Sequence, residues 1–178
     1  MRFPVAAHVL LFLGWSVALV PSSYADDPCA TFTWDVTHER TLFGREPQSL
    51  AAGQALAASP LLMIDRLYRL QLKGQSEVTF VAPPGGKTPR DARTYAGLAL
   101  FAADTGGVYR IALDQRLWVD VVVNGSLVPA KGFQGRPGCN TPHKIVEFVL
   151  PAKTTATLQF SAGSMPRAKV TVTRSPDD

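Results

Sequence analysis

Two histidines and a carboxylate are the residues of this chain whose types could hold a reactive metal. His38 and His143, together with Glu147 or alternatively Glu39, could supply two imidazoles and one carboxylate, a set that leaves positions on iron open for oxygen and substrate. Along a straight strand His143 and Glu147 share one face but lie about 13 Å apart, so a shared site needs a further strand or a bulge. In the structural alternative, which we favour, His143 begins a strand and His38 belongs to a polar turn.

Two aspartates that interrupt apolar segments near tryptophans could bind or hydrolyse sugars. Asp35 follows Trp34, and Asp120 follows Trp118 in a later segment. Indole rings stack on the apolar faces of sugars, while carboxylates accept hydroxyl protons or act as acid and base. Trp118 and Asp120 are our candidates for ligand binding, with Trp118 as the aromatic platform. The structural alternative, which we favour, is that strand alternation places each aspartate on the face opposite its tryptophan.

Other catalytic motifs are missing from the sequence. There is no GxSxG nucleophile elbow, and the pairs Gly85-Gly86 and Gly106-Gly107 stand in predicted turns rather than between a strand and a helix. We therefore assign no catalytic residue and expect no cofactor. Iron is the alternative if the two histidines converge.

The first 25 residues have the organisation of a secretory signal peptide. Arg2 supplies the positive start, residues 5–20 are almost wholly apolar, and Ser23-Tyr24-Ala25 gives the small-x-small cleavage pattern. The sequence therefore predicts a mature chain that begins at Asp26 and is periplasmic or secreted. No later run of about 18 apolar residues follows, so we expect no membrane span in the mature chain.

Cys29 and Cys139 are the two cysteines of the chain. An even number of cysteines in an exported protein predicts one disulfide. The functional alternative has less support because the two thiols lack the CxxC spacing of redox or metal sites. The predicted bridge would tie the mature N-terminus to a loop rich in glycine and proline.

Length and charge limit the number of domains and the kinds of partner. The predicted mature chain, residues 26–178, has about 150 residues, a common size for one domain. Eighteen Lys and Arg against 14 Asp and Glu give a formal net charge of +4, and the basic residues are scattered along the chain. Phosphate binding requires a clustered basic stripe. We therefore expect one domain and no nucleic-acid partner. The partner that we expect is an envelope protein or a small ligand.

Short alternating segments separated by turns predict an all-β fold. The nine segments with this pattern are residues 66–73, 77–82, 95–102, 108–114, 117–123, 126–131, 143–150, 155–161 and 168–174. Their number and spacing predict an antiparallel β-sandwich, jelly-roll or similar, with about nine strands. Asn124-Gly125 predicts a type I′ turn that joins two of them. Within residues 143–150, Lys144, Val146, Phe148 and Leu150 share one face, and His143, Ile145, Glu147 and Val149 share the other.

The N-terminal part of the predicted domain is less regular. Residues 31–36 alternate as a half-buried strand would, and residues 38–43 fit one helical turn that ends at Gly44. Residues 48–62 are rich in small side chains and predict irregular or edge structure. At most one or two short helices are therefore expected. The glycine- and proline-rich segments predicted as loops are residues 82–89 and 131–142.

The order of several motifs resembles a family of small exported proteobacterial proteins. These motifs are TFTWDVTHERTLF, GVYRIALD, LWVDVVVNG, FQGRPGC, HKIVEFVLPA and LQFSAG, and they extend over most of the mature chain. Some members carry the name homogentisate 1,2-dioxygenase, but the true dioxygenases are much longer cupin enzymes whose iron-ligand motif this chain lacks. Residues 107–163 are also similar to pre-peptidase C-terminal domains, which are β-sandwiches that accompany secreted enzymes.

Three functional hypotheses follow. We expect an exported β-sandwich, linked by a disulfide, that binds a ligand or a partner at the cell envelope without catalysing a reaction. The first alternative is a small metal-dependent, dioxygenase-like oxidoreductase that holds iron with His38, His143 and Glu147. The second alternative is a structural component of the envelope.

Overall fold

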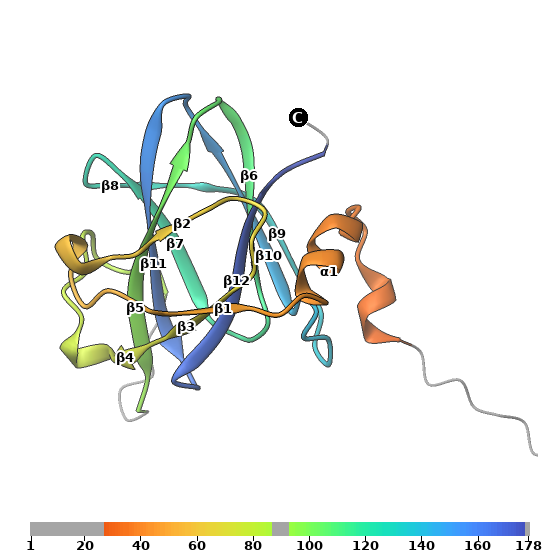
Figure 1. The fold of residues 1–178 in the computed structure, drawn as a ribbon, viewed down its shortest axis with the longest axis horizontal. Coiled ribbons are helices and arrows are strands. Elements are labelled where there is room, and N and C mark those ends of the chain that lie inside the picture. Colours follow the sequence, from red (N-terminus) through yellow and green to blue (C-terminus); the bar gives the residue numbers. More distant parts are fainter. Residues whose placement is uncertain (1–26, 87–92, 177–178) are drawn as a thin grey trace, which may run out of the picture.

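Two β-sheets packed face to face form the body of the molecule. The computed structural model describes residues 27–86 and 93–176, which fold into a sandwich of twelve strands (Figure 1). The predicted all-β sandwich is confirmed, with twelve strands in place of about nine. Residues 66–73 and 126–131 each divide into two strands, residues 48–62 add β1 and β2, and the strand predicted at residues 77–82 is absent. The predicted signal peptide lies outside the described residues.

Each sheet contains six strands. The first sheet has the order β1 (Gln48–Ala51), β3 (Tyr68–Gln71), β12 (Arg167–Arg174), β6 (Gly107–Leu113), β10 (Lys144–Leu150) and β9 (Ala130–Gly135). The second has the order β2 (Leu61–Leu62), β5 (Tyr95–Ala103), β11 (Thr154–Gly163), β7 (Trp118–Val123) and β8 (Ser126–Val128), and β4 (Lys73–Gly74) also pairs with β5. Only β1 and β2 pair in parallel with their neighbours among these strands. Both lie at sheet edges, as expected for residues 48–62.

Side-chain alternation explains how the core forms between the sheets. On β10, Val146, Phe148 and Leu150 point into this core, while Ile145 belongs to a second apolar cluster on the outer face of the same sheet. These are the two faces that the sequence predicts. Burial of each large apolar side chain contributes about 1.5–3 kcal/mol to folding, so a one-residue shift of register would be strongly destabilising.

The predicted hairpin between β7 and β8 is confirmed. Val123 pairs with Ser126, and the two residues between them have positive φ angles of 50° for Asn124 and 78° for Gly125. A type I′ turn requires this conformation at both positions. The turn therefore fixes the register of β8 at the edge of the second sheet.

Residues 32–43 cover part of the outer face of the first sheet. The α-helix α1 (Thr37–Phe43) ends at Gly44, as predicted, and lies beside β12 in Figure 1. Three short 3-10 helices complete the described helical structure: η1 (Pro28–Thr31), η2 (Leu56–Ala58) and η3 (Gln75–Glu77). Val36 and Phe43 pack on Ala112 and Ile145 of the sheet. The outer face is thus partly covered by α1 and the segment before it, while Val149 stays exposed on it.

The predicted strand at residues 31–36 is wrong. Its alternation correctly predicts that Phe32, Trp34 and Val36 pack toward the sheet, but its backbone forms no ladder with a strand. Instead, the amide of Thr33 donates to the side chain of Gln134 at 2.9 Å. A side chain therefore supplies the hydrogen-bond acceptor that a neighbouring strand would otherwise supply to this segment.

The predicted strand at residues 77–82 is also wrong. The buried amide of Gln159 accepts hydrogen bonds from the backbone N–H groups of Val81 and Ala82 at 2.6 and 2.9 Å and donates to the carbonyl of Ala82 at 3.0 Å. This one side chain replaces strand pairing. The loop predicted at residues 131–142 begins later than predicted, because β9 continues to Gly135 through pairing with β10.

The predicted disulfide between Cys29 and Cys139 is confirmed. It joins η1 to the loop between β9 and β10, with the two Cα atoms 5.1 Å apart and 110 residues between them in sequence. A disulfide of this kind indicates an oxidising, non-cytoplasmic compartment. No helix in the described part of the chain has the length and apolar character needed to cross a membrane.

Candidate functional site

A cavity of about 250 Å³ lies at the open edge of the sandwich. Residues of β7 and β8 from the second sheet line one side, and residues of β9 and β10 from the first sheet line the other. Pro129 is the single residue between β8 and β9, so the chain passes from one sheet to the other at this cavity. We call this cavity the edge pocket.

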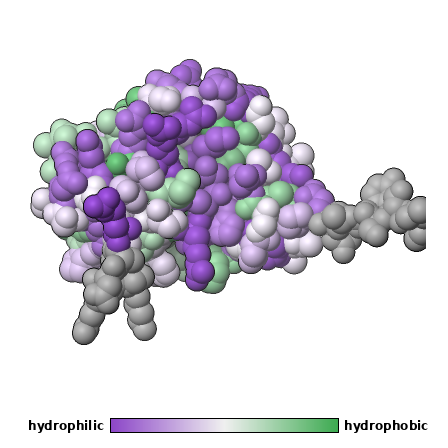
Figure 2. Space-filling view, turned by 90° about the horizontal axis from the view of Figure 1, so that it is seen from below, coloured by the Kyte–Doolittle hydropathy of each residue, from purple (hydrophilic) through white to green (hydrophobic). Residues whose placement is uncertain are grey.

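Exposed apolar side chains gather at the edge pocket. Three of its lining residues are large and exposed: Trp118 at 43%, Leu127 at 42% and Phe133 at 70%. Figure 2 shows one face of the molecule, which is mostly hydrophilic with hydrophobic residues in small areas. Exposed apolar groups that converge on a cavity mark binding sites more often than isolated ones do. The edge pocket is therefore our candidate functional site.

Asp120 organises the polar end of the edge pocket. Its Oδ1 accepts a hydrogen bond from the indole Nε1 of Trp118 at 2.8 Å, and its Oδ2 accepts one from the amide of Gly85 at 3.0 Å. Trp118 and Asp120 are two residues apart on β7, so they share a face. The expectation that alternation separates this pair is therefore wrong, and both candidate ligand-binding residues do line one cavity.

The Trp118 ring is partly covered by the loop before residue 87. A Cβ atom built on Gly86 would lie 2.5 Å from Cγ of Trp118, closer than any real side chain approaches. Only glycine allows this contact. Because the loop lies against the ring, Trp118 contributes a wall of the pocket rather than a bare platform for stacking.

Lys144 brings a positive charge to the same end of the edge pocket. Its Nζ lies 5.2 Å from the centroid of the Trp118 ring and donates to the carbonyl of Leu117 at 3.3 Å. Burial lowers the pKa of Lys144 from its ordinary value; the charge of Asp120 opposes this change and that of Arg116 adds to it. No carboxylate of the described residues lies within ion-pair distance of this ammonium group.

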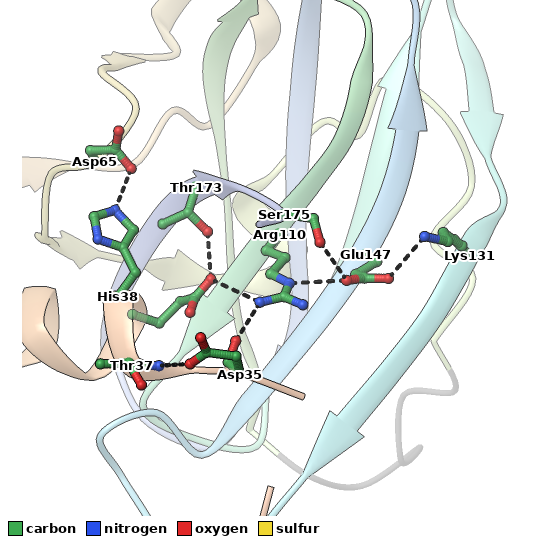
Figure 3. Close-up of polar contacts among 10 residues, drawn as sticks. Asp35, Thr37, His38, Asp65, Arg110, Lys131, Glu147, Thr173 and Ser175 are labelled. Atoms are coloured by element: carbon green, nitrogen blue, oxygen red, sulfur yellow. Dashed lines mark hydrogen bonds and ion pairs between the residues drawn. The ribbon is translucent and has the colours of Figure 1, made fainter. Parts of the chain in front are cut away.

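The three residues predicted as metal ligands have separate partners. The Nε2 of His38 lies 2.8 Å from Oδ1 of Asp65, in the turn between β2 and β3. The Nδ1 of His143 lies 3.1 Å from the carbonyl oxygen of Cys139. Figure 3 shows Glu147 on the far side of Arg110 from His38. Among residues 27–86 and 93–176, no three His, Cys, Asp or Glu side chains form a group that could hold a metal ion.

Glu147 instead belongs to a buried charged cluster beneath α1 (Figure 3). The Nε of Arg110 lies 2.9 Å from Oε1 of Glu147, the residue directly opposite it on β10. The Nη1 of Arg110 donates a hydrogen bond to the carbonyl of Asp35 at 2.6 Å. The residues of this Arg110 cluster are Arg110, Glu39, Glu147, Thr173 and Ser175. Arg110 is fully buried.

The Arg110 cluster connects α1 and the segment before it to the sheet. Oε1 of Glu39 lies 3.7 Å from Nη1 of Arg110 and accepts a hydrogen bond from Thr173 on β12 at 2.7 Å. The guanidinium of Arg110 also lies 5.3 Å from the centroid of the Trp34 ring. This contact occupies Trp34, the other tryptophan that the sequence placed beside an aspartate. Asp35 accepts from the amide of Thr37, and this bond holds the pKa of its carboxyl below the ordinary value.

Sequence reasoning missed Arg110 and Lys144, and it offered Glu39 only as an alternative metal ligand. Arg110 stands in the middle of an apolar strand, so a buried partner of opposite charge could have been expected for it. The register between β6 and β10, which places Glu147 opposite Arg110, could not have been predicted from the sequence. Lys144 shares the inward face of β10 with Val146 and Phe148, which was a signal that a charge enters the core edge. Nothing in the sequence distinguished Glu39 as a partner of Arg110.

Comparison with known proteins gives no assignment. No protein-family model matches the chain, and neither a curated protein nor a solved structure matches it significantly. The similarity to small exported proteobacterial proteins therefore stays a prediction.

Proposed function

We propose that this protein is exported to the cell envelope and there binds a small, mostly apolar ligand in the edge pocket without transforming it. The observation that carries this proposal is the convergence of Trp118, Leu127 and Phe133, all large and exposed, on one cavity of about 250 Å³. Such exposure has a cost in water that a bound apolar ligand removes. The leader sequence and the disulfide support the envelope as the place of action.

The size of the edge pocket sets the expected affinity. A ligand of about ten non-hydrogen atoms, bound with about −0.5 kcal/mol per atom, would have a binding free energy of about −5 kcal/mol. This value corresponds to a dissociation constant of roughly 0.2 mM. The binding assay must therefore reach millimolar ligand concentrations.

A substitution that fills the cavity tests the proposal. Ala130 is exposed and lines the edge pocket, so Ala130→Phe is expected to occupy the space and weaken the binding of 1-octanol at least ~10-fold in calorimetry, since it blocks the burial of several CH₂ groups. Val149 is the matched control, because it is 57% exposed on the opposite face of the adjacent β10. Val149→Phe should bind octanol as the wild-type protein does.

Two results would contradict the proposal. One is wild-type protein that binds no octanol at millimolar concentration, and the other is equal loss of binding in both phenylalanine variants. Metal analysis separates the proposal from the oxidoreductase alternative: stoichiometric iron that disappears in His143→Ala would favour the enzyme.

A further inference from the structure

The two ends of the edge pocket differ in chemistry, and this difference narrows the class of ligand that the proposed binding function would use. At one end Lys144 presents an ammonium group with three N–H donors, one of which is directed to the carbonyl of Leu117. Its Nζ has no carboxylate partner among the described residues. A partly buried charge without an opposite charge is costly, and a bound anion would remove that cost.

The charges around Lys144 favour an anion over a cation. Arg116 adds a second positive charge near the ammonium group. Asp120 is the one nearby negative charge that affects Lys144, but both of its oxygens accept hydrogen bonds, from Trp118 and from Gly85. Asp120 therefore sits at the edge of the indole, whereas Lys144 lies over its ring face. The two cations Lys144 and Arg116 outnumber the single carboxylate of Asp120, so the net charge at this end of the pocket is positive.

The other end of the edge pocket is apolar. Lys144, Val146 and Phe148 point to the same side of β10, and all three line the cavity. Phe133 and Ala130, the partners of Val146 and Phe148 on β9, line it as well. At the usual rise of about 3.3 Å per residue, the backbone positions of Lys144 and Phe148 are about 13 Å apart. An extended apolar chain can lie along this wall with its charged end at Lys144.

We infer that the edge pocket selects a small amphiphilic carboxylate, whose charged group pairs with Lys144 and whose apolar chain lies along Val146 and Phe148. This inference rests on the proposed binding function and adds the charge and the orientation of the ligand.

Three probes of equal chain length and different charge test this inference. Octanoate, 1-octanol and octylamine are titrated by calorimetry at pH 7 into the wild-type protein. A charge-assisted hydrogen bond contributes about 1.5–3 kcal/mol, so octanoate should bind ~10-fold or more tightly than octanol. Octylamine should bind weakest, because its ammonium group meets that of Lys144.

Lys144→Met should abolish the preference for octanoate while octanol binding remains. Lys131→Met is the matched control. Lys131 is a lysine of the adjacent strand β9, but its Nζ lies 3.6 Å from Oε2 of Glu147 in the Arg110 cluster and is therefore already paired. It should keep the preference. Lys144→Arg, which retains the positive charge, should keep it as well.

Each possible result decides the question. Equal binding of octanoate and octanol by the wild-type protein, tightest binding of octylamine, or a preference that survives Lys144→Met would overturn the inference and leave the proposed function intact. Failure of octanol to bind to the wild-type protein would overturn the proposed function and, with it, the inference that rests on it. The wild-type ratio decides alone if Lys144→Met does not fold.

Discussion

The Arg110 cluster and the edge pocket contain the same pair of groups in opposite settings. In each, a cationic side chain lies over an indole ring, at 5.3 Å for Arg110 over Trp34 and at 5.2 Å for Lys144 over Trp118. Arg110 is fully buried and has two carboxylates and a backbone carbonyl as partners. Lys144 reaches the surface and, among the described residues, has one carbonyl partner. On our proposal, the first contact holds the fold together and the second is open to a ligand.

The two contacts share their residue types, a cation and an indole, and differ in the partners of the cation. A buried cation that is already paired with carboxylates of its own chain has little charge left to attract a ligand. A partly exposed cation beside exposed apolar groups retains that capacity. Variants that remove either cation should therefore affect different measurements.

The largest effect is expected from loss of the Arg110 side chain. Arg110→Met leaves the buried carboxylate of Glu39 without a cation and that of Glu147 with Lys131 alone, and breaking a buried ion pair on one side costs about 3–5 kcal/mol. The free energy of unfolding in urea should fall by this amount. The comparison would fail if Arg110→Met were as stable as the wild-type protein.

Removal of the disulfide should have the next largest effect. The Cys29→Ser, Cys139→Ser double variant loses a link that closes a loop of 110 residues, and such links contribute about 2–4 kcal/mol. Since η1 leads into the segment that covers Arg110, the loss should appear in urea unfolding and in faster hydrogen exchange of α1. Octanol affinity at low temperature should not change, because neither cysteine lines the edge pocket.

A smaller loss is expected at the polar end of the edge pocket. Asp120→Ala leaves the indole N–H of Trp118 and the amide of Gly85 without their acceptor, which costs about 1–3 kcal/mol. Trp118 fluorescence should also shift as the ring loses its tether. Asp35→Ala is the matched control, because Asp35 is exposed and accepts from Thr37 alone in this region; its effect on stability should be smaller and should leave Trp118 fluorescence unchanged.

The smallest effect, and one of opposite sign, is expected for Lys144. Burial lowers its pKa in the folded protein, so folding disfavours the charged form. This destabilisation is fully present below the folded pKa and disappears as pH rises toward the ordinary value of 10.5. Lys144→Met should therefore raise the free energy of unfolding at pH 7, with a gain that shrinks at alkaline pH. A loss of stability at pH 7 would show that Lys144 is a structural cation like Arg110.

Patterns local to one strand were sufficient to predict the all-β sandwich class, but not the order of strands in the two sheets. Alternation assigned the two faces of β10 correctly, and Asn124-Gly125 located the hairpin. Pairings that depend on distant side chains could not be predicted, as the irregular residues 77–82 illustrate, since Gln159 lies far along the chain. For the same reason Arg110 and Glu147 could be seen as charged residues in strands but not as neighbours.

The candidate site was predictable only in part. Trp118 and Asp120 were chosen for sugar chemistry, and both line the cavity, but their mutual hydrogen bond follows from an i, i+2 spacing that the sequence analysis misread. Phe133 lay in a predicted loop. Its exposure at the pocket depends on β9 continuing to Gly135, which requires the pairing with β10.

The single-residue connection at Pro129 has a consequence for ligand size. Val128 ends a strand of the second sheet and Ala130 begins a strand of the first, yet two residues of chain span at most about 7 Å, whereas stacked sheets are usually about 10 Å apart. The two layers must converge there into a wedge. Because covalent bonds fix the narrow end of this wedge, a branched or polycyclic ligand cannot widen it. We therefore expect the pocket to bind slim unbranched chains in preference to bulky ligands.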